Sequence, residues 1–157
     1  MPTTLQEEIR QRKPFGSAEE EAMLSIARTA AVLDHAAGEV LKQHGLTPTQ
    51  YNALRILRGA GPKGLCCQEI AERMINRDPD VTRLVDRLEA RKLVERARSE
   101  EDRRVVVTKI TGEGLKILAA IDREAEDMPK QVIGHLGEKR LRILIGLLER
   151  ARQSTDE

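Results

Sequence analysis

The sequence predicts a mainly α-helical fold with one small β-hairpin, and three observations lead to this prediction. Aromatic residues make up 1% of the chain and charged residues 34%, a composition that favours helices packed through Leu, Ile, Val and Ala over a β-sandwich. Apolar residues recur at helical spacing over most of the chain. A β-branched run with strand character appears only within residues 93–110.

The length of 157 residues indicates a single domain, because it allows one hydrophobic core and is short for two ordinary domains. No stretch approaches the roughly 20 consecutive apolar residues that a membrane span needs, and the N-terminal residues lack the apolar centre of a signal peptide. We therefore expect a cytoplasmic protein with no membrane partner. The formal net charge of +1 neither favours nor excludes nucleic acid, so basic charge must be judged by its placement.

Two helices are expected in the first part of the chain. The first is predicted over residues 17–45, because Ser-Ala-Glu-Glu at its start has the spacing of a capping box and apolar residues then recur at helical period. Thr47 is placed to cap the second helix, Pro48 fits its first position, and Gln50 can reach back to the N–H of the cap. The second helix is predicted to stop near Gly59.

Two short helices joined by a tight turn are expected next. They are predicted over residues 68–75 and 79–92. Asp78 and Pro79 supply a cap followed by proline in the first turn of the second of these helices. Two short helices separated by so tight a turn cross at a steep angle, which is the geometry of a helix-turn-helix.

The character of the chain then changes to strand. Residues 93–96 and 104–110 flank a polar loop, which predicts a β-hairpin. Thr111 can cap a fifth helix, Pro129 is expected to interrupt it, and a last helix is predicted from about Glu138.

Four segments in this order resemble the MarR (multiple antibiotic resistance regulator) family, and the resemblance covers the chain from about residue 22 to residue 151. Any one of them alone is a weak signal, but their order and spacing together are a strong one. They are similar to the family's second-helix entry, its third helix, its recognition helix, and its wing with the helix beyond, and lie at residues 46–51, 68–73, 81–89, and 102–104 with 111–114.

The resemblance implies a winged helix-turn-helix fold and a function in transcription. Residues 46–110 would form the DNA-binding lobe, and residues 17–45 and 111–153 the dimerisation helices. The expected partner is double-stranded DNA, bound by a homodimer that acts as a sequence-specific repressor on a palindromic operator. In the family, small ligands bind between the lobe and the dimerisation helices, so we expect an effector, whose identity the residues do not reveal.

The residues predicted to face DNA on the helices follow from their outward positions. Asp80, Thr82, Arg83 and Arg87 lie among the outward positions of the recognition helix. Arginine can bind guanine O6 and N7 with two hydrogen bonds, which makes Arg83 and Arg87 the strongest candidates for base or phosphate contact. Gln68, at the start of the preceding helix, can donate to a phosphate. The alternative is a solvated helix face whose arginines pair with neighbouring acids.

The hairpin tip carries a second group of candidates. Arg98, Arg103 and Arg104 lie close together there, and arginines on a β-loop can enter the narrow, electronegative minor groove. The resemblance implies that Arg104 is the minor-groove arginine and that Asp102 orients the wing through a salt bridge. The alternative is a solvated tip whose own acidic side chains neutralise these arginines.

The sequence departs from the family at the cap of the third helix, where Cys66 stands in place of Ser or Thr, and at both ends of the recognition helix. The family usually ends its recognition helix with glycine, which allows a left-handed turn, but this chain has Lys92 there. Asp78 and Asp80 add negative charge where the recognition helix approaches DNA. A carboxylate favours the helix N-terminus and, near a base edge, prefers the cytosine amino group.

Rival functions were weighed against DNA binding. No metal-ligand spacing, phosphate-binding glycine loop or nucleophile motif points to an enzyme, and His35, His44 and His135 are too scattered for a metal site. We expect no enzyme, cofactor or metal. The two alternatives left open are a winged-helix protein-interaction module without DNA binding and a thiol-based redox sensor at Cys66 and Cys67, whose adjacency suits a structural disulfide poorly.

Overall fold

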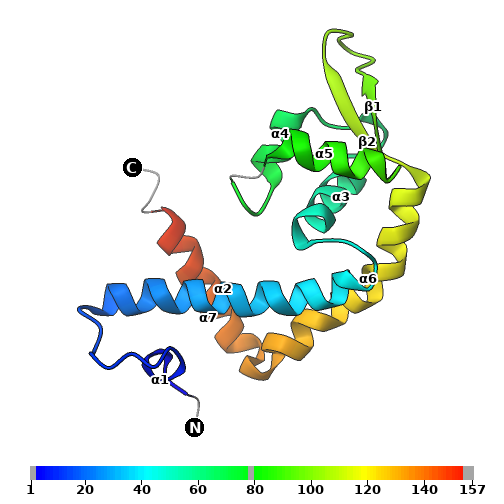
Figure 1. Ribbon diagram of the computed structural model, residues 1–157. Helices are drawn as coiled ribbons and strands as arrows, with labels where there is room; N and C mark the ends of the chain where they lie inside the picture. Colours follow the sequence, from blue (N-terminus) through cyan, green and yellow to red (C-terminus); the bar gives the residue numbers. More distant parts are fainter. Residues whose placement is uncertain (1–2, 78–79, 154–157) are drawn as a thin grey trace.

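A helical frame carries a smaller lobe in the computed structural model, which describes residues 3–77 and 80–153 (Figure 1). The long helices α2, α6 and α7 make up the frame, and helices α3 to α5 with the hairpin form the lobe. The elements are α1 Leu5–Glu8, α2 Ala18–Lys42, α3 Pro48–Ala60, the 3₁₀ turn η1 Gly61–Lys63, α4 Cys67–Arg73, α5 Val81–Ala90, β1 Val94–Arg98, β2 Val106–Ile110, α6 Gly112–Ile133, the 3₁₀ turn η2 Gly134–Leu136 and α7 Gly137–Gln153.

The starts of α2 and α3 follow from their caps. The hydroxyl of Ser17 accepts from the N–H of Glu20 at 3.2 Å, which confirms the predicted cap. The carboxylate of Glu20 accepts from Gly16 at 2.6 Å, one residue before the cap, so the predicted reciprocal bond is displaced. The capping box of Thr47 and Gln50 is confirmed, with hydrogen bonds of 3.2 and 3.1 Å.

A short helix near the N-terminus was not expected from the sequence. Helix α1 begins after Thr4, whose N–H donates to the Glu7 carboxylate at 2.8 Å while its hydroxyl accepts from the Glu7 N–H at 3.4 Å. The bond from Thr4 lowers the pKa of Glu7. The spacing Thr-x-x-Glu was a readable signal for this capping box.

The recognition helix α5 is shorter than predicted. It spans Val81–Ala90 instead of 79–92, and its cap is Asp80, whose carboxylate accepts from the Arg83 N–H at 3.1 Å. The predicted cap at Asp78 and the proline at Pro79 lie outside the described residues. Asp80 satisfies a free N–H of the first turn, which explains why the helix begins directly after it.

Helix α5 ends at Ala90, and a left-handed residue that is not a glycine turns the chain two positions later. Lys92 has a φ of 59°, and the N–H of Leu93 donates to Leu88 O at 3.0 Å across the turn. The hydroxyl of Thr111 donates to the carbonyl of Lys92 at 2.7 Å. The turn that the family makes with glycine is therefore made here by a lysine.

The hairpin is antiparallel, with Val94 opposite Ile110 and Arg98 opposite Val106. The predicted segments were offset, because β1 runs two residues beyond Arg96 and β2 begins two residues after Arg104. Leu65 forms a further bridge to Thr108 through backbone bonds of 3.0 and 2.7 Å. The hairpin is thereby attached to the segment that enters α4.

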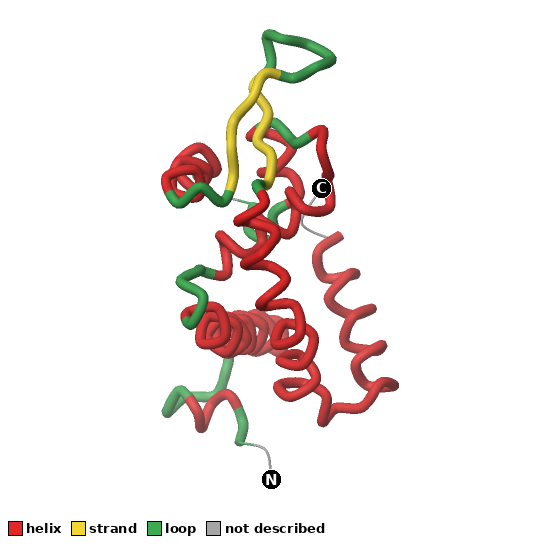
Figure 2. Tube along the Cα trace, turned by 90° about the vertical axis from the view of Figure 1, so that its right-hand side faces the viewer, coloured by secondary structure: helices red, strands yellow, loops and turns green. Residues whose placement is uncertain are grey.

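The expected interruption at Pro129 is wrong. Helix α6 continues through the exposed Pro129 to Ile133, because one proline in the last turns removes a single hydrogen bond, and this cost does not end the helix. Gly137, with a φ of 75°, then turns the chain into α7. Figure 2 shows α7 standing apart from the lobe.

The core lies in the lobe and extends into α6. Helix α7 has no buried residue, and α2 has only Leu41. No helix among the described residues is long and apolar enough to cross a membrane. The largest fully buried side chains come from α3, α4, α5, the hairpin and α6, and are Leu54, Leu57, Ile70, Val85, Leu88, Val94, Thr108, Leu118 and Ile121.

Candidate nucleic-acid interface

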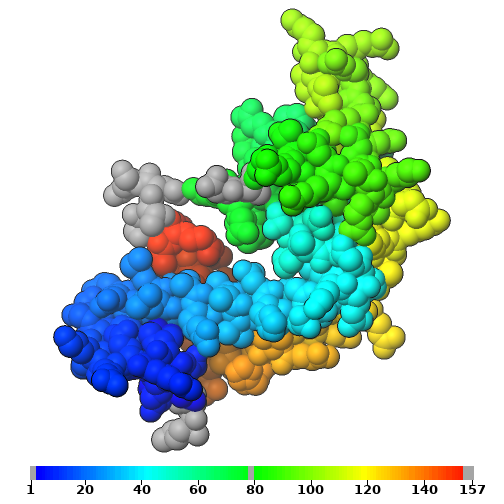
Figure 3. Space-filling model, in the orientation of Figure 1, coloured from blue at the N-terminus to red at the C-terminus, as the bar shows by residue number. Residues whose placement is uncertain are grey.

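Helix α5 has one buried face and one exposed face. Its buried side chains join the hydrophobic core of the lobe, which fixes the helix in position. The helix lies on the face of the lobe seen in Figure 3, and the wing projects beyond it. The sequence prediction for the outward positions agrees with this burial, since Asp80, Thr82, Arg83 and Arg87 are all exposed.

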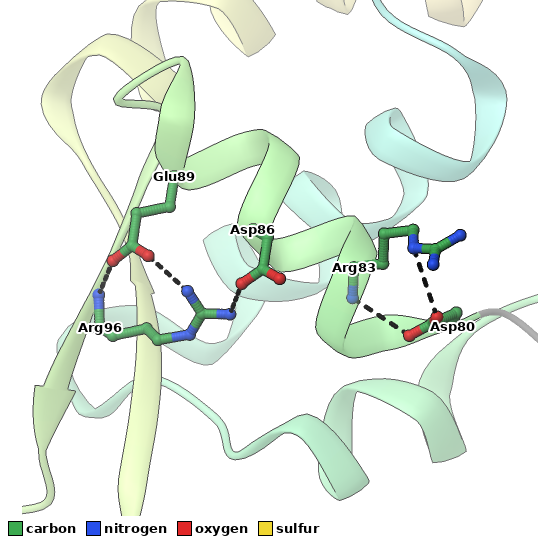
Figure 4. A network of polar contacts seen from close by, with 5 residues as sticks. All are labelled: Asp80, Arg83, Asp86, Glu89 and Arg96. Atoms are coloured by element: carbon green, nitrogen blue, oxygen red, sulfur yellow. Dashed lines mark hydrogen bonds and ion pairs between the residues drawn. The ribbon is translucent and has the colours of Figure 1, made fainter.

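Asp80 and Arg83 interact at the start of α5 (Figure 4). Besides capping the helix, the Asp80 carboxylate lies 3.8 Å from Arg83 Nε. The two side chains are 64% and 71% exposed, so solvent screens their attraction. The alternative of arginines paired with nearby acids therefore holds in part for Arg83, although most of its guanidinium stays accessible. The contact of either residue with DNA remains a prediction.

Gln68 lies in the first turn of α4 and is exposed, as the prediction requires. Its side-chain amide donates to Glu72 Oε1 at 3.1 Å. Binding a phosphate with this amide would replace a bond between two exposed side chains. The role of Gln68 toward DNA stays a prediction.

The wing tip brings its predicted residues together. Asp102 accepts from the N–H and the Nε of Arg104, and Arg98 donates to the carbonyl of Arg104 at 3.4 Å. Arg103 is exposed beside them. Asp102 thus forms an ion pair with Arg104 inside the wing, while its wing-orienting role and the contact of these residues with DNA stay predictions.

A second acid of the wing loop pairs outside the wing. Glu101 Oε1 lies 3.0 Å from Lys63 Nζ in the turn η1. Both side chains are about four-fifths exposed, at 79% and 83%, so this pair adds little stability. It does engage one of the acids that were weighed as neutralising the wing arginines.

The sequence reasoning missed an ion-pair bridge between the recognition helix and the wing. Arg96 on β1 donates to Asp86 at 2.5 Å and to Glu89, both on α5 (Figure 4). Its hydrogen bond to Asp86 and those to Glu89 raise the pKa of the Arg96 guanidinium. A signal was present, because Arg96 follows the buried Val94 by two residues and must share its face of the strand.

Two clefts border these residues. The first has a volume of about 460 Å³ and lies between the start of α3 and α5, and the second has about 750 Å³ and lies between η1, α4 and the wing loop. The first cleft includes both candidate base-contacting arginines in its wall. Its lining residues are Thr47, Thr49, Gln50, Asn76, Asp80, Arg83, Leu84 and Arg87.

The cysteines lie at the start of α4, and the three histidines lie in other segments of the chain. Cys66 and Cys67 are free thiols of intermediate exposure, and the N–H of Cys66 donates to Glu69 Oε2 at 2.9 Å to cap α4. His44 Nε2 lies 3.5 Å from Glu124 Oε1. Within residues 3–77 and 80–153, no group of three or more His, Cys, Asp or Glu side chains is placed to hold a metal ion.

Comparisons with known proteins agree with this architecture. The model of the MarR family matches residues 44–105. The chain is 30% identical over 110 residues to the HTH-type transcriptional regulator MhqR of Bacillus subtilis, across 70% of this chain and 74% of MhqR. It is 40% identical over 76 residues to the HTH-type transcriptional repressor MdtR of the same organism, across 48% of each chain.

A solved structure extends the similarity to almost the whole chain. The crystal structure of a MarR transcription factor from Planctomyces limnophilus is 39% identical and superposes with a TM-score of 0.64, covering 87% of this chain and 98% of that one. The lobe, the hairpin and the frame helices are thus matched together. On the family model, the MhqR relative and the fold, this chain belongs to the MarR family of winged helix-turn-helix, DNA-binding transcriptional regulators.

Proposed function

We propose that the chain acts as a homodimeric repressor that binds a palindromic operator and leaves it when a small ligand binds. The observation that carries the DNA-binding part is the exposed pair Arg83 and Arg87 on a helix whose opposite face is fixed in the core. The proposed lobe comprises residues 46–110, and the proposed dimerisation helices are residues 17–45 and 111–153. We propose no enzymatic activity, in keeping with the missing catalytic motifs.

The proposed docking places α5 in the major groove and the wing beside it. Arg83 and Arg87 can each contact a guanine edge or a phosphate from α5. Arg104, at the tip of the hairpin, is 93% exposed and can enter the adjacent minor groove. Positive charge from both elements would neutralise phosphates, so affinity should fall steeply as salt rises.

The proposed homodimer rests on the apolar surface of the frame. Met23 and Val32 on α2 are 73% and 50% exposed, and Ile143 and Leu147 on α7 are 57% and 51% exposed. An apolar surface that is spread over two helices favours burial against a partner. A second copy would also supply the second recognition helix, about one turn of DNA or roughly 34–36 Å away, which a palindromic operator requires.

Repression and release by a ligand complete the proposal. A dimer that occupies an operator competes with other proteins for the same DNA, which is the simplest route to repression, and the relative MdtR is described as a repressor. A ligand placed between the lobe and the dimerisation helices could use the cleft of about 450 Å³ between α2 and the start of α3, whose lining includes His35, Lys42 and Pro48. It can release the protein only if it binds the free form more tightly than the DNA-bound form.

The test is selection of bound duplexes from a random library, followed by titration of the enriched sequence at several salt concentrations. We expect a sequence with two inverted half-sites and an affinity that drops as salt increases. Sedimentation of the free protein should give a dimer, and sedimentation of the complex should give two subunits per duplex. Enrichment of no sequence, together with salt-independent binding, would support the protein-interaction alternative and overturn the proposal.

A further inference from the structure

The bridge between Arg96, Asp86 and Glu89 joins the two elements that the proposed function assigns to DNA. The guanidinium of Arg96 uses one terminal nitrogen for Asp86, at 2.5 Å, and the other for Glu89. The backbone N–H of Arg96 also donates to Glu89 Oε1 at 3.1 Å. The strand is therefore bonded to the recognition helix through the side chain and the backbone of one residue.

The strand end of this bridge is firmly anchored. Arg96 pairs with Thr108 on β2, and Thr108 is only 2% exposed. Thr108 in turn exchanges two backbone hydrogen bonds with Leu65, before α4. The base of the wing is thus held by the core of the lobe, so the Arg96 side chain connects a fixed strand to α5.

The charge of the bridge is also placed where DNA would approach. Asp86 lies on α5 between Arg83 and Arg87 in sequence, and it is 59% exposed. An unpaired carboxylate at this position would repel phosphates. The Arg96 side chain is 26% exposed and its two terminal nitrogens are engaged by carboxylates, so it is less available to DNA than the arginines of α5.

We propose that Arg96 is a positioning residue for specificity, which holds the recognition helix at a fixed angle to the wing without itself reading DNA. The inference rests on the proposed function, because it concerns how two DNA-binding elements are kept in register. Base readout requires side chains placed within a fraction of an ångström, whereas contacts to phosphates tolerate more movement. Loss of the bridge therefore reduces binding to the correct sequence more than binding to any sequence.

Positioning and charge neutralisation make different predictions for lysine. Lysine keeps the positive charge, but its compact ammonium lacks the planar fork with which arginine serves two carboxylates at once. If positioning matters, Arg96→Lys and Arg96→Met both lose specificity. If the charge alone matters, Arg96→Lys behaves as the parent does.

The experiment compares the parent with Arg96→Lys and Arg96→Met on two duplexes of equal length, one carrying the sequence enriched by the parent and one scrambled. The measured quantity is the specificity ratio, which is the dissociation constant for the scrambled duplex divided by that for the selected duplex at one salt concentration. We expect both variants to lower this ratio by roughly tenfold. Arg12→Met is the matched control, because Arg12 is an exposed arginine before α2 that lies outside the proposed lobe and dimerisation helices, and it should keep the parent ratio.

Selection repeated on Arg96→Lys gives a readout that a merely structural role would not move. We expect weaker preferences at the base pairs beside the wing while the thermal unfolding midpoint stays close to that of the parent. A parent-like ratio and motif for Arg96→Lys would overturn the inference and leave the proposed function intact. A parent that enriches no sequence would overturn both. If Arg96→Met is unfolded, Arg96→Lys and Asp86→Asn still decide the question through the same ratio.

Discussion

Asp102 accepts two hydrogen bonds from Arg104 at the wing tip, one from the backbone N–H at 3.0 Å and one from Nε at 3.3 Å. This geometry holds the base of the arginine while its terminal nitrogens stay accessible. Arg104→Ala should weaken binding to the selected and the scrambled duplex alike. It should also reduce the slope of log affinity against log salt concentration by about one. Fluorescence anisotropy at several salt concentrations measures both effects, and an unchanged slope would remove Arg104 from the interface.

Arg83→Ala should have a different signature, because the predicted contact is to a base. We expect a relaxed preference at one or two base pairs, with a loss of roughly 1–3 kcal/mol on the selected sequence and little change on the scrambled duplex. Competition titrations with single base-pair substitutions measure this. Lys13→Ala is the control, because Lys13 is an exposed cation outside the proposed lobe and dimerisation helices. Equal losses on all duplexes would make Arg83 a phosphate contact.

Ile143→Glu should disrupt the proposed dimer, since it introduces a charge on the apolar surface of α7. We expect monomers in sedimentation velocity experiments and at least roughly tenfold weaker operator binding, because a single lobe covers one half-site. Ile75→Glu makes the same change at an apolar residue that is 85% exposed and lies in the lobe between α4 and α5, outside the proposed dimerisation helices, so this variant should remain dimeric. A dimeric Ile143→Glu variant would place the interface elsewhere.

Gly64 and Gly61 offer a matched test of the wing attachment. Both have a φ of 68°, but a Cβ on Gly64 would lie 2.5 Å from Thr108 O, whereas nothing lies within 4 Å of one on Gly61. Gly61→Ala should cost about 1–3 kcal/mol of unfolding free energy, because its φ of 68° and ψ of −154° lie in a region that glycine almost alone adopts. Gly64→Ala should cost about 1–3 kcal/mol more, from the clash. Urea denaturation measures both, and equal losses would show that the bridge of Leu65 to Thr108 adapts.

Lys92→Gly should stabilise the protein. The left-handed backbone of Lys92 is unfavourable for a side chain, and the bond from Thr111 to its carbonyl is retained in the variant. We expect a gain of about 0.5–1 kcal/mol after the entropy of glycine in the unfolded chain is subtracted. Thermal denaturation checks this expectation, and a lower midpoint would show that the lysine side chain contributes contacts of its own.

Much of the fold could be predicted because local signals and tertiary structure agree. Thr47 with Gln50 marks a helix start by hydrogen bonds among neighbours, and the apolar spacing on α5 gives its buried face. Pro129 was misjudged because the cost of a proline depends on where in the helix it falls. The start of α5 was misplaced because Asp78 and Asp80 are both good caps, and only packing chooses between them.

The candidate site was predictable in its outward residues and not in its internal bonds. Exposure of Arg83 follows from the helical period, which a sequence displays directly. The bridge of Arg96 to Asp86 and Glu89 depends on the angle at which the strand leaves the helix, and no local pattern encodes that angle. The sequence shows only that Arg96 shares a strand face with the buried Val94.

Helix α6 belongs to both parts of the molecule. Leu118 and Ile121 on this helix are fully buried with the residues of the lobe, while its far end leads through η2 into α7. The orientation of the lobe relative to the frame is therefore set by α6. A small tilt of α6 at its far end would displace the wing tip by a larger distance. A change in the frame, far from DNA, could therefore alter how the wing meets the duplex.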